Sequence, residues 1–104
     1  MTELIELEKT DTVVQIALNR PEAYNAFNYD LVSQLTKHLT TLAGDDSVSG
    51  VVVTGRGKAF CAGGDLKWAI GYPASPRAAF HTLASQFHLA ILEIRRMKKP
   101  VVAA

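Results

Sequence analysis

Residues 55 to 66 read GRGKAFCAGGDL and hold the residue types best suited to chemistry in this chain. Four of these residues are glycines, and a lysine, a cysteine and an aspartate lie among them. Glycine lets a backbone approach a ligand closely and adopt unusual dihedral angles. A run of this kind can therefore bind phosphate, hold a nucleophile or present backbone amides to an anionic oxygen.

Three known glycine-rich motifs fit this spacing poorly. A phosphate-binding P-loop needs Ser or Thr after its lysine, but Ala59 follows Lys58. A dinucleotide-binding fingerprint begins correctly and then has Phe60 where a third small residue is required. A thiol version of the nucleophile elbow, centred on Cys61, would need a glycine at Ala59. Cys61 is therefore interpreted as a small packing residue.

The remaining interpretation is a loop of backbone amides at the start of a helix. The amides of residues 62 to 64 can turn toward a ligand, and amides at a helix N-terminus favour an anionic oxygen. Asp65 is placed to cap that helix, a role that we favour over proton transfer. We expect Phe60 and Cys61 to pack beneath the loop.

The residues before this loop predict a hairpin and then a helix. Two β-branched runs within residues 4–20 predict an antiparallel hairpin, which Pro21 ends because it lacks a backbone donor. Leucines every three or four residues predict an amphipathic helix over residues 29–43, with Asn28 as its N-cap and Gly44 as its stop.

The second half of the chain predicts a parallel sheet with helical crossovers. Consecutive valines at 51–53 are typical of a strand that is covered on both faces, as in parallel sheets. A short helix should follow Asp65, a longer helix should span residues 76–97, and a strand should begin at Val101. The predicted order is ββαβααβ, an α/β fold with at least one right-handed crossover.

Composition excludes several classes of protein. The chain has 104 residues and is 48% hydrophobic, which predicts one globular core rather than disorder. A formal net charge of +1 gives no general attraction to nucleic acid or to an anionic membrane. No apolar run is long enough to span a bilayer, and one cysteine and no signal peptide predict a cytoplasmic location. His81 and His88 lack the further ligands of a metal site.

Three segments resemble one known family. GRGKAFCAGGDL resembles the signature loop of the enoyl-CoA hydratase/isomerase (crotonase) family, and ALNRPEAYNAF resembles its first coenzyme A-contacting loop. RRMKKPVVAA resembles the segment that leads into the family's second glycine-rich turn. The resemblance implies that residues 1–104 are the N-terminal portion of a single crotonase-like domain, with a ClpP/crotonase ββα spiral fold that is incomplete at residue 104.

The resemblance also implies roles for individual residues. The amide of Gly64, where most relatives have alanine, would be one of two oxyanion donors to the thioester oxygen of an acyl-CoA substrate. Arg20 and Lys58 are candidates for the coenzyme A phosphates, and Trp68 would cover the acyl pocket or pack elsewhere. No covalently bound cofactor and no metal are implied. The residues expected to line the substrate site are Ala23, Tyr24, Ala26, Ala62, Gly63, Gly64, Asp65 and Leu66.

Among the family's reactions, the resemblance favours enoyl-CoA hydratase. Isomerase, decarboxylase, thioester hydrolase and dehalogenase remain alternatives, because the second donor and the acid and base are expected beyond Ala104. A non-catalytic coenzyme A-binding or structural fragment is an alternative of another class. We expect these 104 residues alone to be inactive, and the complete protein to be a homotrimer or hexamer whose remaining part lies in the same or a separate chain.

Overall fold

The computed structural model describes residues 3–104 and confirms the predicted order of elements, with one added 3-10 turn. The helices and strands lie within about two residues of their predicted limits. In chain order they are β1 (Ile5–Thr10), β2 (Val13–Leu18), the 3-10 helix η1 (Pro21–Ala23), α1 (Tyr29–Ala43), β3 (Gly50–Gly55), α2 (Leu66–Ile70), α3 (Pro76–Arg96) and β4 (Val101–Ala103).

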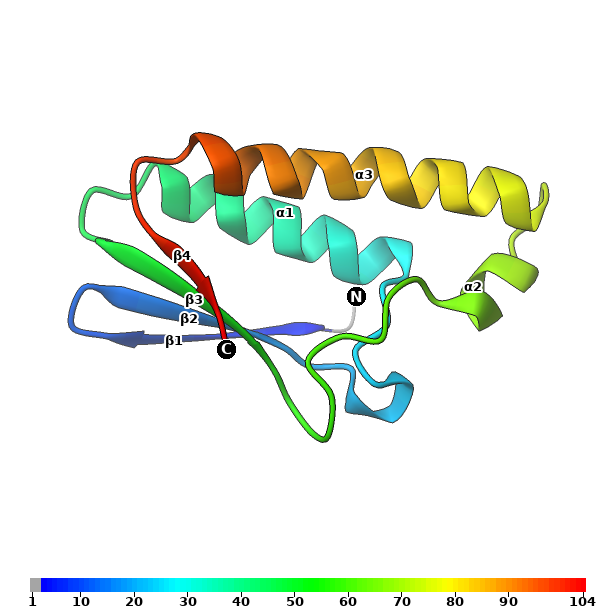
Figure 1. Cartoon of the computed structure of the whole chain (residues 1–104), viewed down its shortest axis with the longest axis horizontal. Coiled ribbons are helices and arrows are strands. Elements are labelled where there is room, and N and C mark those ends of the chain that lie inside the picture. Colours follow the sequence, from blue (N-terminus) through cyan, green and yellow to red (C-terminus); the bar gives the residue numbers. More distant parts are fainter. Residues whose placement is uncertain (1–2) are drawn as a thin grey trace.

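The strands form one sheet in the order β1-β2-β3-β4 (Figure 1). β1 pairs antiparallel with β2, whereas β2 with β3 and β3 with β4 are parallel pairs. The predicted hairpin and parallel sheet are both confirmed. Because each parallel pair needs a crossover, α1 connects β2 to β3, and α2 and α3 connect β3 to β4.

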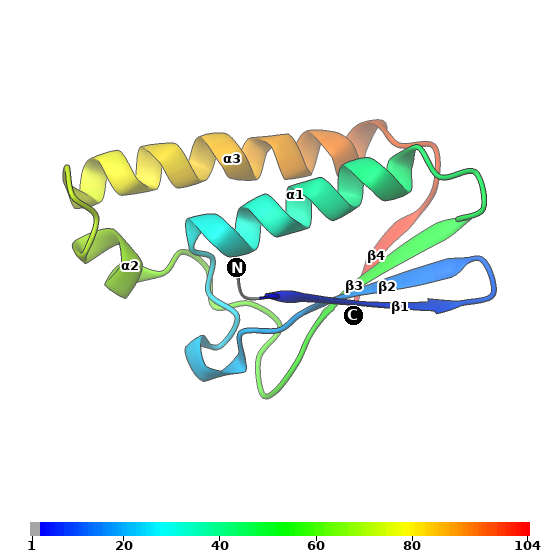
Figure 2. The same cartoon turned by 180° about the vertical axis from the view of Figure 1, so that it is seen from behind.

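Both long helices lie along the same face of the sheet, as the two opposite views show (Figures 1 and 2). Val51 and Val53 are buried, but Val52 between them is only half-buried. Since alternate residues of a strand point to opposite faces, the expectation that this strand is covered on both faces was wrong for the described residues.

The core lies between α1 and the sheet. Ile16 of β2 and Leu31 and Leu39 of α1 have no exposed surface. Full burial of each such side chain stabilises the fold by about 1.5 to 3 kcal/mol. The leucines of α1 therefore repeat with the helical period because they pack against the sheet. The same packing of α1 on the sheet positions the loops at the ends of the strands.

Side-chain caps begin all three α-helices. The Asn28 side chain accepts a hydrogen bond from the Leu31 amide at 2.9 Å, and Asp65 accepts one from the Trp68 amide at 3.2 Å. Both caps were predicted, and Ser75 supplies a similar cap for α3. The cap at Asp65 fixes the point where the glycine run ends and α2 begins.

α3 is the longest helix and packs along α1. Leu83 and Ala90 are buried, whereas Leu89 and Leu92 are about half exposed on its other side. Within residues 3–104, no helix combines the length and the apolar character that crossing a membrane requires.

Candidate functional site

The glycine run, residues 55–66, lies against the loop that follows β2. The Ala62 amide donates to the Tyr24 carbonyl at 3.0 Å, and the Phe27 amide donates to the Gly63 carbonyl at 2.7 Å. The Asp65 amide in turn donates to the Phe27 carbonyl at 2.9 Å. Two segments that are far apart in the sequence thus form a short parallel bridge in the loops that follow β2 and β3.

This bridge leaves the Gly64 N–H free to donate a hydrogen bond to a ligand. Phe27 is bonded to the residues on either side of Gly64, so the N–H and C=O of Gly64 itself point away from the Phe27 segment. Within residues 3–104 the Gly64 N–H has no hydrogen-bond partner, and the residue is exposed. The neighbouring Gly63 amide faces the Cys61 sulfur at 3.5 Å.

Asn25 holds the two loops together. Its side chain is fully buried, and its Oδ1 accepts a hydrogen bond from the Arg20 amide at 2.7 Å. Its Nδ2 donates to the carbonyls of Arg56 and Ala59 at 2.9 and 2.8 Å. This role of Asn25 was not predicted from the sequence. The available signal was an asparagine in a turn, since asparagine tolerates the positive φ of 56° found here better than most residues.

Arg20 links the same two loops through an ion pair. Its guanidinium lies 2.6 Å from the Asp65 carboxylate and also donates to the Ala26 carbonyl at 2.8 Å. Both side chains are largely buried, with 17% and 10% of their surfaces exposed. Asp65 therefore caps α2 and pairs with Arg20 at once.

The surroundings set the protonation of two groups in the loops. Burial alone would raise the pKa of the Asp65 carboxyl, but the hydrogen bonds from Arg20, Trp68 and Lys67 and the Arg20 charge together lower that pKa. Burial raises the pKa of the Cys61 thiol, against a smaller opposing effect of the Gly63 amide. Cys61 is thus a protonated thiol at neutral pH, packed against the hydrophobic core.

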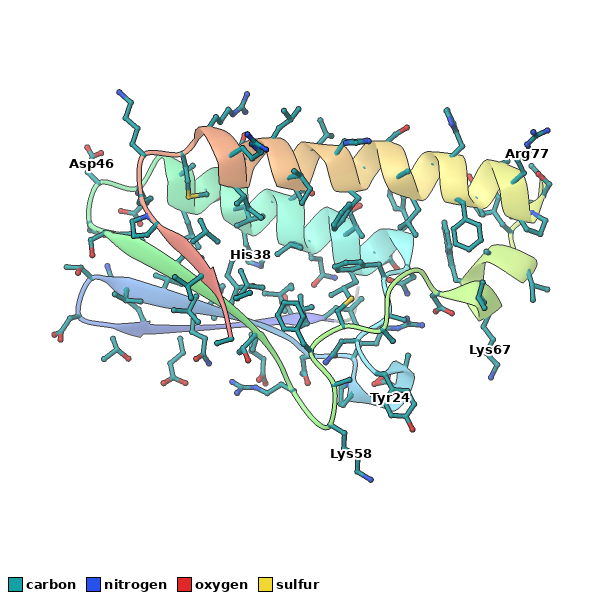
Figure 3. All side chains as sticks on the ribbon, viewed as in Figure 1. Tyr24, His38, Asp46, Lys58, Lys67 and Arg77 are labelled. Carbon is teal, nitrogen blue, oxygen red and sulfur yellow. The ribbon has the colours of Figure 1, made fainter. Side chains whose placement is uncertain are left out.

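A polar groove of about 660 Å³ runs beside these loops. It brings together most of the predicted substrate-site residues, and it adds Lys67, Asn28, Glu22 and Trp68. Tyr24 and Gly63 do not line it: the Tyr24 side chain is 58% exposed and points away from the loops (Figure 3). The lining residues are Arg20, Glu22, Ala23, Ala26, Asn28, Ala62, Gly64, Asp65, Leu66, Lys67 and Trp68.

An apolar pocket of about 360 Å³ also reaches Gly64. The rings of Phe27 and Phe87 lie 5.2 Å apart, centroid to centroid, on one side of it. Gly64 borders both the polar groove and the apolar pocket, so its unpaired amide lies where the two meet. The lining residues of the apolar pocket are Phe27, Val32, Gly63, Gly64, Phe80, Leu83, Ala84 and Phe87.

Comparison with known proteins decides the family. Residues 8–104 match the family described as enoyl-CoA hydratase/isomerase. The chain belongs to this family, also called the crotonase family.

Individual members show how broad the family is. The chain is 38% identical over 96% of its length to 4-chlorobenzoyl coenzyme A dehalogenase-2 of Arthrobacter sp. It is 31% identical over its full length to 1,2-epoxyphenylacetyl-CoA isomerase of Escherichia coli. The crystal structure of an enoyl-CoA hydratase from Mycobacterium smegmatis matches 98% of the chain, with a TM-score of 0.88 and 37% identity. The chain spans 37% to 40% of the length of these proteins.

One expectation about the crotonase signature loop was wrong. Cys61 packs against the core as expected, but Phe60 is 46% exposed. Phe60 lines an adjoining apolar cavity of about 330 Å³, which shares Phe27, Gly63 and Phe87 with the apolar pocket and includes residues of β4.

The remaining candidates of this crotonase-family chain have different surroundings. Lys58 extends from the tip of the glycine run into solvent (Figure 3). Trp68 lines the polar groove rather than the apolar pocket, and its ring lies 5.3 Å from that of Tyr72. His81 and His88 are exposed, and the part of the chain that the structure describes contains no cluster of three or more metal-binding side chains.

Proposed function

We propose that the protein carrying this chain is an acyl-CoA thioester enzyme in which the Gly64 amide binds the thioester oxygen. The observation that supports this most directly is the position of the Gly64 N–H, unpaired within residues 3–104, between a polar groove and an apolar pocket. An acyl-CoA is divided in the same way, because its thioester lies between the polar coenzyme A and the apolar acyl group.

The chemistry needs a donor of this kind. Attack at the β-carbon of a 2-enoyl-CoA, or removal of the α-proton of an acyl-CoA, moves negative charge onto the thioester oxygen to form an enolate. A preorganised amide stabilises that charge as it develops. Residues 1–104 would supply one such donor and part of the coenzyme A groove. A second donor and the acid and base would have to come from elsewhere in the whole protein.

Hydration of a 2-enoyl-CoA is our first choice of reaction. Water adds to the β-carbon, and a proton adds to the α-carbon of the resulting enolate. The Mycobacterium smegmatis enoyl-CoA hydratase supports this choice through 37% identity and a TM-score of 0.88. Isomerisation is an alternative, since it passes through the same kind of enolate. A homotrimeric or hexameric assembly and a cytoplasmic location stay predictions.

Dehalogenation of an acyl-CoA is the second candidate. It is favoured by the 38% identity to the Arthrobacter 4-chlorobenzoyl coenzyme A dehalogenase over 96% of the chain. Release of chloride from 4-chlorobenzoyl-CoA, without hydration of crotonyl-CoA, would favour this candidate over the hydratase.

The test is hydration of crotonyl-CoA by the whole protein and by Gly64 variants. Gly64→Pro removes the N–H and should lower kcat about 100- to 1000-fold. Gly64→Ala keeps the N–H, so its kcat should stay close to that of the wild type. Equal activity of the proline variant would overturn the role of Gly64, and no activity toward any acyl-CoA would favour the non-catalytic alternative.

A matched control comes from the same loop. Cys61→Ser changes a neighbouring polar atom but leaves every backbone amide in place. Its activity should be close to that of the wild type, because the thiol is protonated and packs against the core. A large loss in this variant would point to a direct chemical role for Cys61 instead.

A further inference from the structure

We propose that Phe80 is a specificity-determining residue that fits the apolar pocket to a flat, aromatic acyl group. The absence of a side chain at Gly64 allows the Phe80 ring to take that position. This proposal rests on the proposed function, because it places the acyl group of a thioester beside the Gly64 amide.

The first observation is the closeness of Phe80 to Gly64. A Cβ atom added at Gly64 would lie 3.0 Å from Cε1 and 3.7 Å from Cδ1 of the Phe80 ring. The shorter distance is below ordinary van der Waals separation, about 3.5 Å or more between carbon atoms. A methyl group at position 64 would therefore require the Phe80 ring to shift by a few tenths of an ångström. Phe80 and Gly64 are therefore near neighbours in the lining of the apolar pocket.

The second observation is the composition of the pocket. Phe27, Phe80 and Phe87 supply three aromatic rings, and no charged side chain is among the residues that line it. The planes of Phe27 and Phe87 are tilted by 47°, so the two rings are neither parallel nor perpendicular to each other. Phe80 itself is 37% exposed, so its ring is at the mouth of the pocket.

These two observations favour a flat acyl group over a flexible one. Two aromatic rings in contact gain more binding free energy than the burial of their apolar surface provides, because the edge of one ring is attracted to the face of the other. A long alkyl chain would gain only from the burial of apolar surface and would lose rotational freedom when it is held in the pocket. An aromatic acyl group should therefore depend on Phe80, and an alkyl chain should not.

The experiment measures binding to the whole protein by calorimetry, with benzoyl-CoA, octanoyl-CoA and free coenzyme A as probes. Phe80→Leu keeps an apolar side chain and removes the ring. It should weaken benzoyl-CoA binding about tenfold, the upper range for one aromatic contact, and should change octanoyl-CoA binding less than twofold. Leu89→Ala is the matched control, because its half-exposed side chain lies on the other side of α3 and does not line the apolar pocket, and it should leave both affinities unchanged.

A second variant tests the link to position 64. Gly64→Ala keeps the amide but requires a small shift of the Phe80 ring, so it should weaken benzoyl-CoA binding when Phe80 is present. In the Phe80→Leu background the same substitution should have little further effect, since the ring that it displaces is gone. Additive losses in the double variant would contradict the coupling and overturn the proposal.

The remaining outcomes separate this proposal from the proposed function. If all three probes bind but Phe80→Leu weakens benzoyl-CoA and octanoyl-CoA equally, or weakens neither, the specificity role is overturned and the proposed function stands. If neither acyl-CoA nor free coenzyme A binds the wild type, the proposed function fails and this proposal fails with it.

Discussion

The Arg20 guanidinium lies 2.6 Å from the Asp65 carboxylate and links two loops that are more than forty residues apart. A second nitrogen of the same guanidinium binds the Ala26 carbonyl. This pair holds the two sides of the polar groove at a fixed separation. Since Asp65 directly follows Gly64, the pair also restrains the part of the backbone that presents the Gly64 amide.

The two roles of Asp65 can be separated by substitution. Asn is as good an N-cap as Asp but carries no charge. Asp65→Asn should therefore keep the cap of α2 and lose the ion pair with Arg20, lowering the free energy of unfolding by about 1.5 kcal/mol. Asp65→Ala loses both and should cost about 1 kcal/mol more. Urea unfolding of the whole protein measures both values, and equal losses would show that the cap contributes nothing.

The Asp65 pair also predicts a dependence of stability on pH. The pKa of Asp65 is lowered in the folded protein, so between its folded and unfolded pKa values the unfolded chain binds more protons. The contribution is fully present above the unfolded value of about 3.9 and is lost as pH falls through the folded pKa. Thermal unfolding from about pH 6 to about pH 3 should show a smaller loss in Asp65→Asn than in the wild type. Parallel curves would contradict this assignment.

Asn25 should be the most sensitive polar residue of the two loops. Asn25→Ala leaves the Arg20 amide and the carbonyls of Arg56 and Ala59 without their partner, in a buried position with positive φ. We expect a loss of about 3 kcal/mol in the free energy of unfolding. Asn28→Ala is the matched control, because it removes only one helix cap and should cost about 1 kcal/mol. Similar losses in the two variants would show that the loops do not depend on Asn25.

Local signals explain why the elements could be predicted from the sequence. Leu31, Leu35 and Leu39 repeat with the period of a helix, and Asn28 and Gly44 mark the two ends of that helix. The consecutive valines of β3 correctly predicted a parallel strand but wrongly predicted that both of its faces are covered, because Val52 is only half-buried. Each of these signals is contained in a few neighbouring residues.

The site could be predicted only where a motif marked it. The glycine run indicated amides near Gly64, but nothing local shows that the Phe27 segment bonds on either side of it. Asn25 and Phe80 were missed as site residues because their importance depends on contacts with residues more than ten positions away. Phe60 was misplaced for the same reason, as an apolar side chain in a loop is buried only if the fold brings a surface to it.

The last prediction concerns the lysines that would bind the coenzyme A phosphates. Lys67 lines the polar groove, and Lys58 lies exposed at the tip of the glycine run. Arg20 already pairs with Asp65, so a phosphate would have to compete with that carboxylate for the Arg20 guanidinium. An exposed charge contributes at most about 1 kcal/mol to such a contact, so Lys67→Ala and Lys58→Ala should each raise KM by up to about fivefold.

Ionic strength and the place of the substituted lysine distinguish a specific phosphate contact from a general loss of positive charge. The increase in KM should shrink at high ionic strength, because salt screens exposed charges. The kcat should stay unchanged, since phosphate contacts are uniform through the reaction. Lys98→Ala is the matched control: that lysine is exposed beyond the end of α3 and does not line the groove, so its KM should equal that of the wild type. If all three variants raise KM alike, the phosphates are attracted by the overall charge rather than held by these two lysines.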